Sequence, residues 1–312
     1  MLNVNRMRIL REVASRGGIA AAANALYTSP SAISQQMAVL EREAGVKLLE
    51  RSGRSVKLTD AGIQLVAHAE HILAILERAQ TDLAIIAQGN LPAGPIRVCA
   101  FPTAARSILI PAVVSLAQTY PFLEPIVSDL EPEESIPMLK ARGMDVVMIY
   151  EFDHLAPSID PGIERHALMN EPMYIALPET DPKATGSLKM TDLADRRWIV
   201  GRDGSSLLEI QIHVANQAGY NPLINFHSND YQVILAAVQA GLGVALVPPL
   251  AMFASVPGVV LRIPEDIRVT RSISALVRSG SSKHPSIAAA LKALTYASEE
   301  ASSRSFTPRP IR

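Results

Sequence analysis

The strongest constraint on the fold lies in residues 20–44, where two short helical segments are separated by about three residues. The second begins with Ser29, which suits the N-cap, and Pro30, whose missing N–H costs nothing at the first helical position. Its apolar face comprises Ile33, Met37, Leu40 and Ala44. The opposite face comprises Ser31, Ser34, Gln35, Ala38 and Arg42. Because a solvated helix face usually has Glu and Lys, this pattern indicates a helix-turn-helix whose second helix lies against another molecule.

Positive charge is concentrated in the first 60 residues. They have a net charge of +4, whereas the rest of the chain has −5 and the whole chain −1. A basic module on an acidic body favours a polyanionic partner for the first part alone. Within it, residues 45–59 suggest a small hairpin, or wing, whose cations suit phosphate contact: Arg51, Arg54 and Lys57. On charge alone this hairpin could be a solvated basic turn, but its place directly after a helix-turn-helix favours phosphate contact.

A long helix is expected from residue 60, capped by Thr59 or Asp60, to about residue 88. Its apolar residues recur at alternating spacings of four and three: Leu65, Ala69, Ile72, Leu76, Ala79, Leu83 and Ile86. Such a heptad seam with polar flanks is typical of a coiled coil, although a helix packed against its own domain could also have it. His68 and His71 lie on this helix without an evident third ligand, so we expect no metal site.

Residues 89–95 are rich in Gly and Pro and mark a domain boundary. Beyond them, alternating strand and helix patterns predict an α/β domain with parallel sheets and with ligands beyond the carboxyl ends of strands. The uncharged stretch 231–261 is interrupted by Gly and Pro, so we expect core rather than a membrane span. The tail, residues 299–312, is rich in Ser, Arg and Pro and is expected to be disordered.

The chain has one cysteine, Cys99, within an apolar strand pattern. A lone cysteine excludes an internal disulfide and fits a reducing cytoplasm, and its apolar surroundings indicate an inert, buried thiol. The N-terminus has no long apolar run typical of a secretory signal. We therefore expect a cytoplasmic protein, and no residue pattern predicts a cofactor.

Five blocks of the sequence resemble the LysR-type transcriptional regulators, at the spacing usual in that family: AANAL (22–26), SPSAISQQ (29–36), LERE (40–43), GVKLLER (45–51) and LTDAG (58–62). The segment AGLGVALVP (240–248) also resembles the family's effector domain, so the resemblance covers nearly the whole chain. Gly18 departs from the Ser or Thr common in the family, which weakens a helix cap. Pro30-Ser31 and Gln35 stand where Gln-Pro and Arg are common, so operator preferences of other members cannot be transferred.

The resemblance implies an N-terminal winged helix-turn-helix, then a linker helix, then an α/β effector domain of two lobes, similar to type 2 periplasmic binding proteins. The implied boundaries are 1–60 for the DNA-binding domain, 61–90 for the dimerising linker helix, 91–298 for the effector domain and 299–312 for the tail. Lobe I would comprise 94–162 and 268–298, and lobe II 163–267. Members act on double-stranded DNA as homodimers or homotetramers, and RNA polymerase is a further expected partner.

The resemblance also implies residue roles. Base edges would be contacted by Pro30, Ser31, Ser34 and Gln35, and phosphates by Arg42, Arg51, Arg54 and Lys57. Dimerisation would use Leu65, Ala69, Ile72, Leu76, Ala79 and Leu83. A small-molecule effector, for which an anion suits the helix N-termini, would lie near Thr103, Ala104, Arg202, Ser205, His227 and Asn229. Each of these could instead be an ordinary helix cap, and His227 a satisfied strand-end histidine. Glu131, Glu133 and Glu134 are expected only to complement a helix N-terminus.

Two other functional classes stay open at this point. An enzyme would need a catalytic constellation, and the chain has no G-x-S-x-G, G-x-x-x-x-G-K or H-E-x-x-H motif, so we expect no enzyme. A solute-binding protein shares the α/β body but needs a signal peptide and has no DNA-binding head. The expected function is a sequence-specific DNA-binding regulator that responds to a small molecule held between the lobes.

Overall fold

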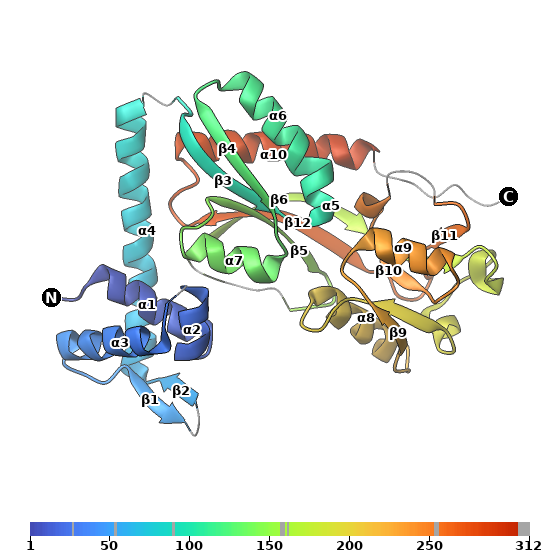
Figure 1. The fold of residues 1–312 in the computed structure, drawn as a ribbon, viewed down its shortest axis with the longest axis horizontal. Helices are drawn as coiled ribbons and strands as arrows, with labels where there is room; N and C mark the ends of the chain where they lie inside the picture. Colours follow the sequence, from blue (N-terminus) through green and yellow to red (C-terminus); the bar gives the residue numbers. More distant parts are fainter. Residues whose placement is uncertain are drawn as a thin grey trace.

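The structure is a computed structural model that describes residues 1–26, 28–52, 55–88, 91–156, 160, 162–252 and 256–304. Figure 1 shows three parts in chain order: a small N-terminal head, one long helix, and a larger domain of two lobes. No helix within the described residues is long and apolar enough to span a membrane.

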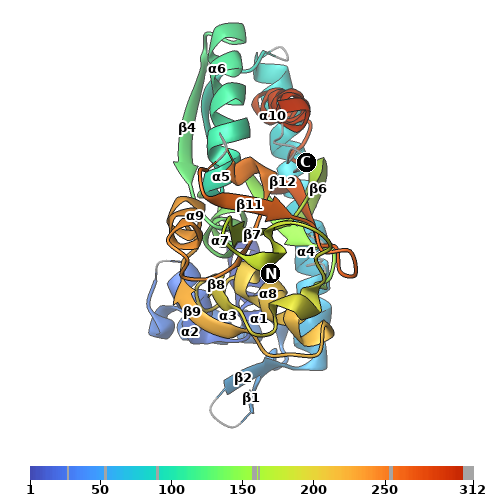
Figure 2. The ribbon, with the colours of Figure 1, turned by 90° about the vertical axis from the view of Figure 1, so that its right-hand side faces the viewer.

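The head consists of three helices and a hairpin, and the last two helices and the hairpin form the predicted helix-turn-helix and wing. Helices α1 (Val4–Ser15), α2 (Ile19–Ala25) and α3 (Pro30–Ala44) pack around a small core that comprises Met7, Leu10, Val13, Ala22, Ala23, Ile33, Met37, Leu40, Leu48 and Ala69. Ser29 Oγ accepts a hydrogen bond from the Ala32 N–H at 3.2 Å, and Gly45 ends α3 with a left-handed φ of 72°. Strands β1 (Leu49–Ser52) and β2 (Ser55–Leu58) form the antiparallel wing at one end of the molecule (Figure 2).

The linker helix α4 (Asp60–Gln88) has the predicted length. Thr59 caps it, because its Oγ1 accepts the Gly62 N–H at 3.0 Å. Leu65 and Ala69 pack into the head core, whereas Ile72, Leu76 and Leu83 are 36%, 38% and 66% exposed. The predicted seam therefore has two parts: its first residues pack within the chain, and its later ones form an exposed apolar stripe.

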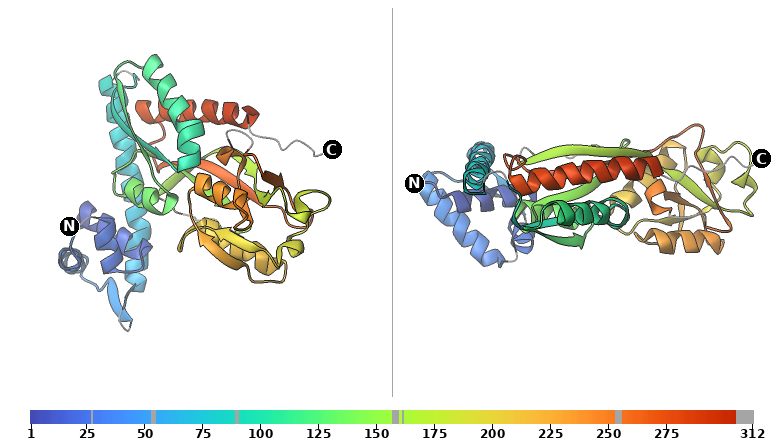
Figure 3. Two further views of the ribbon diagram at one scale, coloured as in Figure 1. Left: turned by 45° about the vertical axis from the view of Figure 1, so that its right-hand side comes forward. Right: turned by 90° about the horizontal axis from the view of Figure 1, so that it is seen from above.

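Lobe I contains a five-stranded sheet in the order β4-β3-β5-β12-β6. The strands are β3 (Gly94–Ala100), β4 (Leu123–Asp129), β5 (Val146–Phe152), β6 (Ile163–Pro172) and β12 (Thr270–Arg278). Successive residues face opposite sides of the sheet. Val98 lies in the core shared with α6 (Ile110–Thr119) and α10 (Pro285–Arg304), and Cys99 in the core shared with α7 (Pro132–Lys140). Figure 3 shows α6 and α10 side by side on one face of the sheet.

The helix that follows β3 is irregular. It consists of α5 (Pro102–Ala104), a π-helical turn (Ala105–Leu109) and α6. Pro111 lacks an N–H and its ring crowds the carbonyl four residues earlier, which a wider turn accommodates. This turn begins where β3 ends, at the side of lobe I that faces lobe II.

Lobe II contains two small sheets. Strand β7 (Tyr174–Pro178) is antiparallel to both of its neighbours, β10 (Ala245–Val247) and β11 (Val259–Arg262). Strand β8 (Arg197–Val200) is parallel to β9 (Leu223–His227), and a bridge from Trp198 to Val244 joins the two sheets. The helices of this lobe are α8 (Ser206–Gln217) and α9 (Tyr231–Gln239), and short 3-10 turns cover Pro182–Ala184, Met190–Leu193 and Pro249–Ala251.

Three predictions for this domain need correction. The sheets are mixed rather than parallel, because β12 runs antiparallel to both β5 and β6. Residues 163–172, predicted to begin lobe II, form β6, which pairs along its whole length with β12 in the sheet of lobe I. The tail predicted from residue 299 is helical as far as Arg304, because Ala301 is buried and continues the apolar face of α10. Residues 305–312 lie outside the described residues.

Candidate nucleic-acid interface and effector cavity

The outer face of α3 is exposed. The exposed side chains are those predicted to face DNA from this helix: Pro30, Ser31, Ser34, Gln35 and Arg42. Ser34 Oγ donates to the Pro30 carbonyl at 2.9 Å, so the hydroxyl is fixed against the helix and keeps its acceptor capacity. Gln35 and Arg42 border a groove of about 660 Å³ that also includes Lys47. Lys47 is a cation of this surface that the sequence pattern does not single out.

The wing is tied to α3 by Glu41. Its Oε1 accepts the backbone N–H groups of Leu48 and Leu49 at 3.0 and 3.2 Å, and its Oε2 lies 2.7 Å from Lys47 Nζ. Burial alone would raise the pKa of Glu41, but Lys47 and these N–H groups outweigh burial and hold the pKa below its usual value. Lys57 is exposed on β2, whereas Arg54 and the side chain of Arg51 lie outside the described part of the chain.

A cavity of about 470 Å³ lies between the two lobes, within the roughly 300–1,000 Å³ typical of small-molecule sites. Its walls come from the turn after β3, the ends of β4 and β5, the start of α7, and the loops after β8 and β9. Strands β3, β4, β5, β8 and β9 each run parallel to a neighbour and contribute their carboxyl ends, where α/β proteins bind ligands. The antiparallel β12 contributes Arg271 from its start. The charged residues of the lining are of both signs: Arg106, Arg202, Arg271, Asp129, Glu131, Glu134 and Asp230.

Arg271 of β12 is a buried cation in the cavity wall. It is 1% exposed, and Glu171 of β6, which is 2% exposed, accepts hydrogen bonds from its Nη2 and Nε at 2.5 and 2.8 Å. Arg271 Nη2 also donates to Thr103 Oγ1 at 3.1 Å, and the guanidinium lies 5.1 Å from the ring centre of Phe101. Burial opposes the charged form, but Glu171 outweighs burial and raises the pKa of Arg271, which stays protonated.

Glu131, which directly precedes α7, is an acidic residue of the cavity lining whose surroundings favour its neutral form. Burial, and then the nearby charge of Glu133, raise the pKa of Glu131 to about 7. Tyr150 Oη donates to Glu131 Oε2 at 3.4 Å, and burial followed by Glu131 also raises the pKa of Tyr150. Near neutral pH this carboxyl group of the cavity is therefore only partly ionised.

The raised pKa of Glu131 predicts a pH dependence of stability. The folded state binds this proton more tightly than the unfolded state, so the contribution is complete below the unfolded pKa of about 4.5 and is lost as pH rises through about 7. We expect the free energy of unfolding to fall by up to about 3 kcal/mol between pH 5 and pH 8 because of this group. Urea denaturation across that range measures it: Glu131→Gln should flatten the fall, and the exposed control Glu124→Gln should not. An identical pH profile for Glu131→Gln and the unchanged chain would refute the assignment.

The predicted effector residues divide into two groups. Thr103, Arg202 and Asn229 line the cavity, and Asn229 Oδ1 accepts the Arg202 N–H at 2.8 Å. Ala104, Ser205 and His227 do not line it. Ala104 is buried in the core of lobe I, Ser205 Oγ accepts the Leu208 N–H as the N-cap of α8, and His227 Nδ1 lies 3.1 Å from the Gly201 carbonyl oxygen.

Sequence reasoning missed Arg271, Tyr150 and the cavity position of Glu131 and Glu134. One signal was present for Arg271, which is a charge within the strand pattern of residues 268–277, because a charge inside a strand is rarely buried unless it is paired. Its partner, Glu171, could not be chosen from the sequence, because the two residues are far apart in the chain and meet through strand pairing alone.

Two family models match this chain. One, described as the LysR substrate binding domain, matches residues 89–298, and the other, described as a bacterial regulatory helix-turn-helix protein of the lysR family, matches residues 4–63. The chain belongs to the LysR family. The predicted order of a winged helix-turn-helix and a two-lobed effector domain is thereby confirmed.

Individual relatives agree with this assignment. The transcriptional dual regulator GltC of Bacillus subtilis is 27% identical over 265 residues, which cover 84% of this chain and 86% of GltC. The OxyR C206S mutant of Corynebacterium glutamicum, with H2O2 bound, matches with a TM-score of 0.60 at 25% identity and covers 100% of this chain and 99% of that one. CbnR in complex with its target DNA matches with a TM-score of 0.53 at 25% identity and covers 95% and 100%. This LysR-family chain is therefore a DNA-binding transcriptional regulator rather than an enzyme.

Proposed function

We propose that this LysR-family regulator binds its small-molecule effector in the cavity between the lobes, with an anionic group of the effector against Arg271, Thr103 and Arg202. The decisive observation is the buried guanidinium of Arg271. Its Nε and Nη2 are engaged by Glu171 and Thr103, whereas Nη1 has no hydrogen bond to any described residue. A charged donor in a cavity wall favours an anionic acceptor.

The acids of the cavity narrow the class of effector. Glu131 and Glu134 lie at the start of α7, and Asp230 lies in the loop after β9. A dianion would meet these carboxylates, so we propose an effector that also has a cationic or proton-donating group, as an amino acid does.

Thermal denaturation of the full chain with a panel of amino acids, monocarboxylates, dicarboxylates and simple amines tests this class. We expect a zwitterionic member to raise the Tm, and the Arg202→Gln variant to bind it at least about tenfold more weakly. The exposed control Arg97→Gln, on lobe I but away from the cavity, should bind normally. Stabilisation by amines alone, or by no member, would refute the proposed effector class.

A thiol-based response to peroxide does not fit this chain. Cys99 is the lone cysteine of the sequence, it is buried in β3, and burial raises its pKa to about 12. Oxidants attack the thiolate, which is scarce at such a pKa, and a lone cysteine cannot form a disulfide within the chain. The bound H2O2 of the OxyR relative therefore suggests no such ligand here.

We further propose that α3 contacts bases through Pro30, Ser31, Ser34 and Gln35, while Arg42, Lys57 and the two wing arginines contact phosphates. A glutamine amide can pair bidentately with adenine, which is worth about 1–3 kcal/mol of discrimination. Gln35→Ala should therefore lose preference at one base pair, whereas Arg42→Ala should weaken binding to all sequences alike and lower the salt dependence. Binding to duplexes with single-base changes measures both, with Gln64→Ala on α4 as the control. Equal losses on specific and random DNA for both variants would contradict the division of roles.

The same proposal includes a homodimer formed through the exposed stripe of α4, which a second copy can cover with an identical stripe. A tetramer would add a second, different interface. We also propose that this regulator of transcription acts in the cytoplasm, with the DNA, and that RNA polymerase is a further partner.

A further inference from the structure

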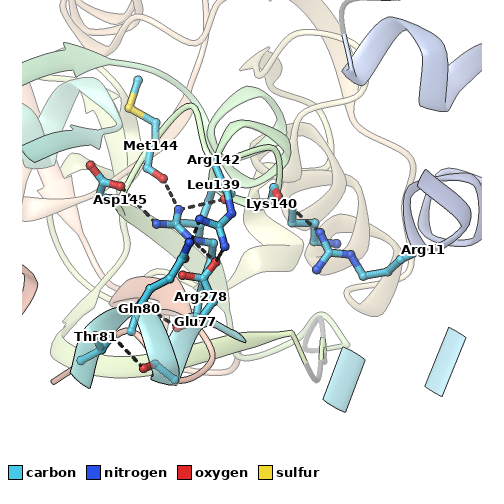
Figure 4. Close-up of polar contacts among 12 residues, drawn as sticks. Arg11, Glu77, Gln80, Thr81, Leu139, Lys140, Arg142, Met144, Asp145 and Arg278 are labelled. Atoms are coloured by element: carbon cyan, nitrogen blue, oxygen red, sulfur yellow. Dashed lines mark hydrogen bonds and ion pairs between the residues drawn. The ribbon is translucent and has the colours of Figure 1, made fainter. Parts of the chain in front are cut away.

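The linker helix docks on lobe I through a charged cluster, shown in Figure 4. Glu77 of α4 is 8% exposed, and its Oε1 lies 2.5 Å from Arg142 Nη2 and 3.1 Å from Arg278 Nε. Arg142 follows α7, and Arg278 ends β12. We call these three residues the linker junction. A largely buried carboxylate shared by two guanidinium groups is favourable while all three are in place and costly when one is removed.

Contacts with the backbone also join α4 to the turn that follows β12 in lobe I. Thr81 of α4 is buried, and its Oγ1 donates to the Gly280 carbonyl at 3.2 Å. Gly280 has a left-handed φ of 90°, and a Cβ at this position would lie 2.6 Å from the Ala74 carbonyl oxygen of α4. The turn after β12 therefore touches the helix backbone directly, which glycine alone permits.

The C-terminal end of α7, which leads to Arg142, is hydrogen-bonded to the head and to β12. Arg11 of α1 donates from Nη2 to the Lys140 carbonyl at 3.3 Å. Arg278 donates from Nη1 to the carbonyls of Leu139 and Met144, at 3.2 and 2.5 Å. Figure 4 shows these contacts around the last turn of α7. A displacement of this turn would therefore change its contacts with the head, with α4 and with β12.

Arg142 adopts a backbone conformation that glycine usually occupies. Its φ is 64°, and it lies one position after the cap of α7, where the Gly143 N–H bonds the Met138 carbonyl at 2.8 Å. A left-handed non-glycine residue is strained, and such strain persists where the surrounding contacts hold it. Here the compensating contacts are the ion pair with Glu77 and a hydrogen bond from Arg142 Nη1 to Gln80 Oε1 at 2.9 Å.

Two elements run from the effector cavity to the linker junction. The start of α7, with Glu134, lines the cavity, and its far end leads to Arg142. Strand β12 has Arg271 in the cavity wall and Arg278 at the junction, which at roughly 3.3 Å per residue places these ends about 23 Å apart. Packed helices and strands shift as units rather than deform, so a movement at one end reaches the other.

We propose that the linker junction couples the effector cavity to the linker helix. Glu77 is a positioning residue in this coupling, because its two ion pairs depend on the position of α7 relative to β12. The inference rests on the proposed function, because it concerns the response of that cavity. A ligand that moves α7 against β12 changes the spacing of the two guanidinium groups and thereby the contact with Glu77. The orientation of α4, and of the head attached to it, changes with that contact.

Hydrogen–deuterium exchange of the full chain, with no ligand added, tests the coupling. The junction variants are Glu77→Gln and Arg142→Gly, and the matched control is Asp82→Asn, an exposed acid on the same helix. Arg142→Gly removes the ion pair and relieves the left-handed backbone, so any loosening that it causes comes from the lost ion pair and not from added backbone strain. We expect both junction variants to raise amide exchange about tenfold in residues 139–145 and 278–281. The deciding result is a rise of at least about threefold in the cavity turns, residues 101–106 and 131–135.

Asp82→Asn should leave both regions unchanged. Faster exchange at the junction with unchanged exchange in the cavity turns would overturn the coupling, and so would no change in either region. Because no ligand is added, the result does not depend on the effector panel. If no member of that panel stabilises the chain while the cavity turns still respond to Glu77→Gln, the proposed function fails and the structural coupling stands.

Discussion

Replacing Arg271 by alanine is expected to lower the free energy of unfolding by about 3–5 kcal/mol, because it leaves the carboxylate of Glu171 buried without a cation. Glu171 is held from both lobes: Arg271 donates to its Oε1, and the Leu250 N–H of lobe II donates to its Oε2 at 3.0 Å. Loss of the arginine should therefore also loosen the contact between the lobes. Urea denaturation of the full chain measures the change.

The matched control is Arg304→Ala, which breaks the exposed pair with Glu300 and should cost less than about 0.5 kcal/mol. A double variant, Arg271→Met with Glu171→Met, should recover much of the loss, since apolar side chains of similar volume can replace a buried ion pair. A loss below about 1 kcal/mol for Arg271→Ala, the size of an ordinary substitution, would mean that the pair is not buried as described.

A Leu76→Glu variant is expected to be monomeric and to bind DNA at least about 100-fold more weakly, because two linked heads gain that much over one. Leu76 lies at the middle of the exposed stripe that also contains Leu83 and Ile86, which are 66% and 79% exposed in a single copy. A charge there would be buried against the partner helix. Sedimentation velocity reports the oligomeric state, and binding to a two-site duplex reports the affinity.

His71→Glu is the control for this variant, because it adds the same charge to an exposed position of α4 outside the stripe. It should remain a dimer and keep its affinity. A dimeric Leu76→Glu variant with normal DNA binding would show that the stripe is not the dimer interface.

The local features of this chain were predictable from its sequence. Ser29, Thr59 and Gly45 cap or end their helices through contacts within a few residues, so the limits of α3 and α4 follow from short-range chemistry. The split of the heptad seam was not predictable in detail. Ala69 is buried in the head core, whereas Leu83 is exposed, although both residues belong to the same heptad pattern.

The features that depend on distant pairing were beyond sequence reasoning. The sequence predicts strand β6 in the wrong lobe, because its pairing partner β12 lies about a hundred residues later in the chain. Arg271 and Glu171 are similarly far apart in the sequence, and Glu77 and Arg278 are further apart still, so neither ion pair could be predicted from the sequence. Thr103, Arg202 and Asn229 could be predicted as cavity residues because they lie in loops at strand ends. Side chains that reach the cavity from within a strand, such as Tyr150, could be identified only from the fold.

The most direct test of the regulator assignment is the binding of the full chain to the DNA upstream of its own coding region, compared with a scrambled duplex of the same length, over a range of salt concentrations. We predict that the upstream duplex binds at least about 1,000-fold more tightly and that affinity falls steeply as salt rises, as phosphate contacts require. Equal affinity for the two duplexes, or affinity that does not change with salt, would contradict the assignment of the head as a sequence-specific DNA-binding domain.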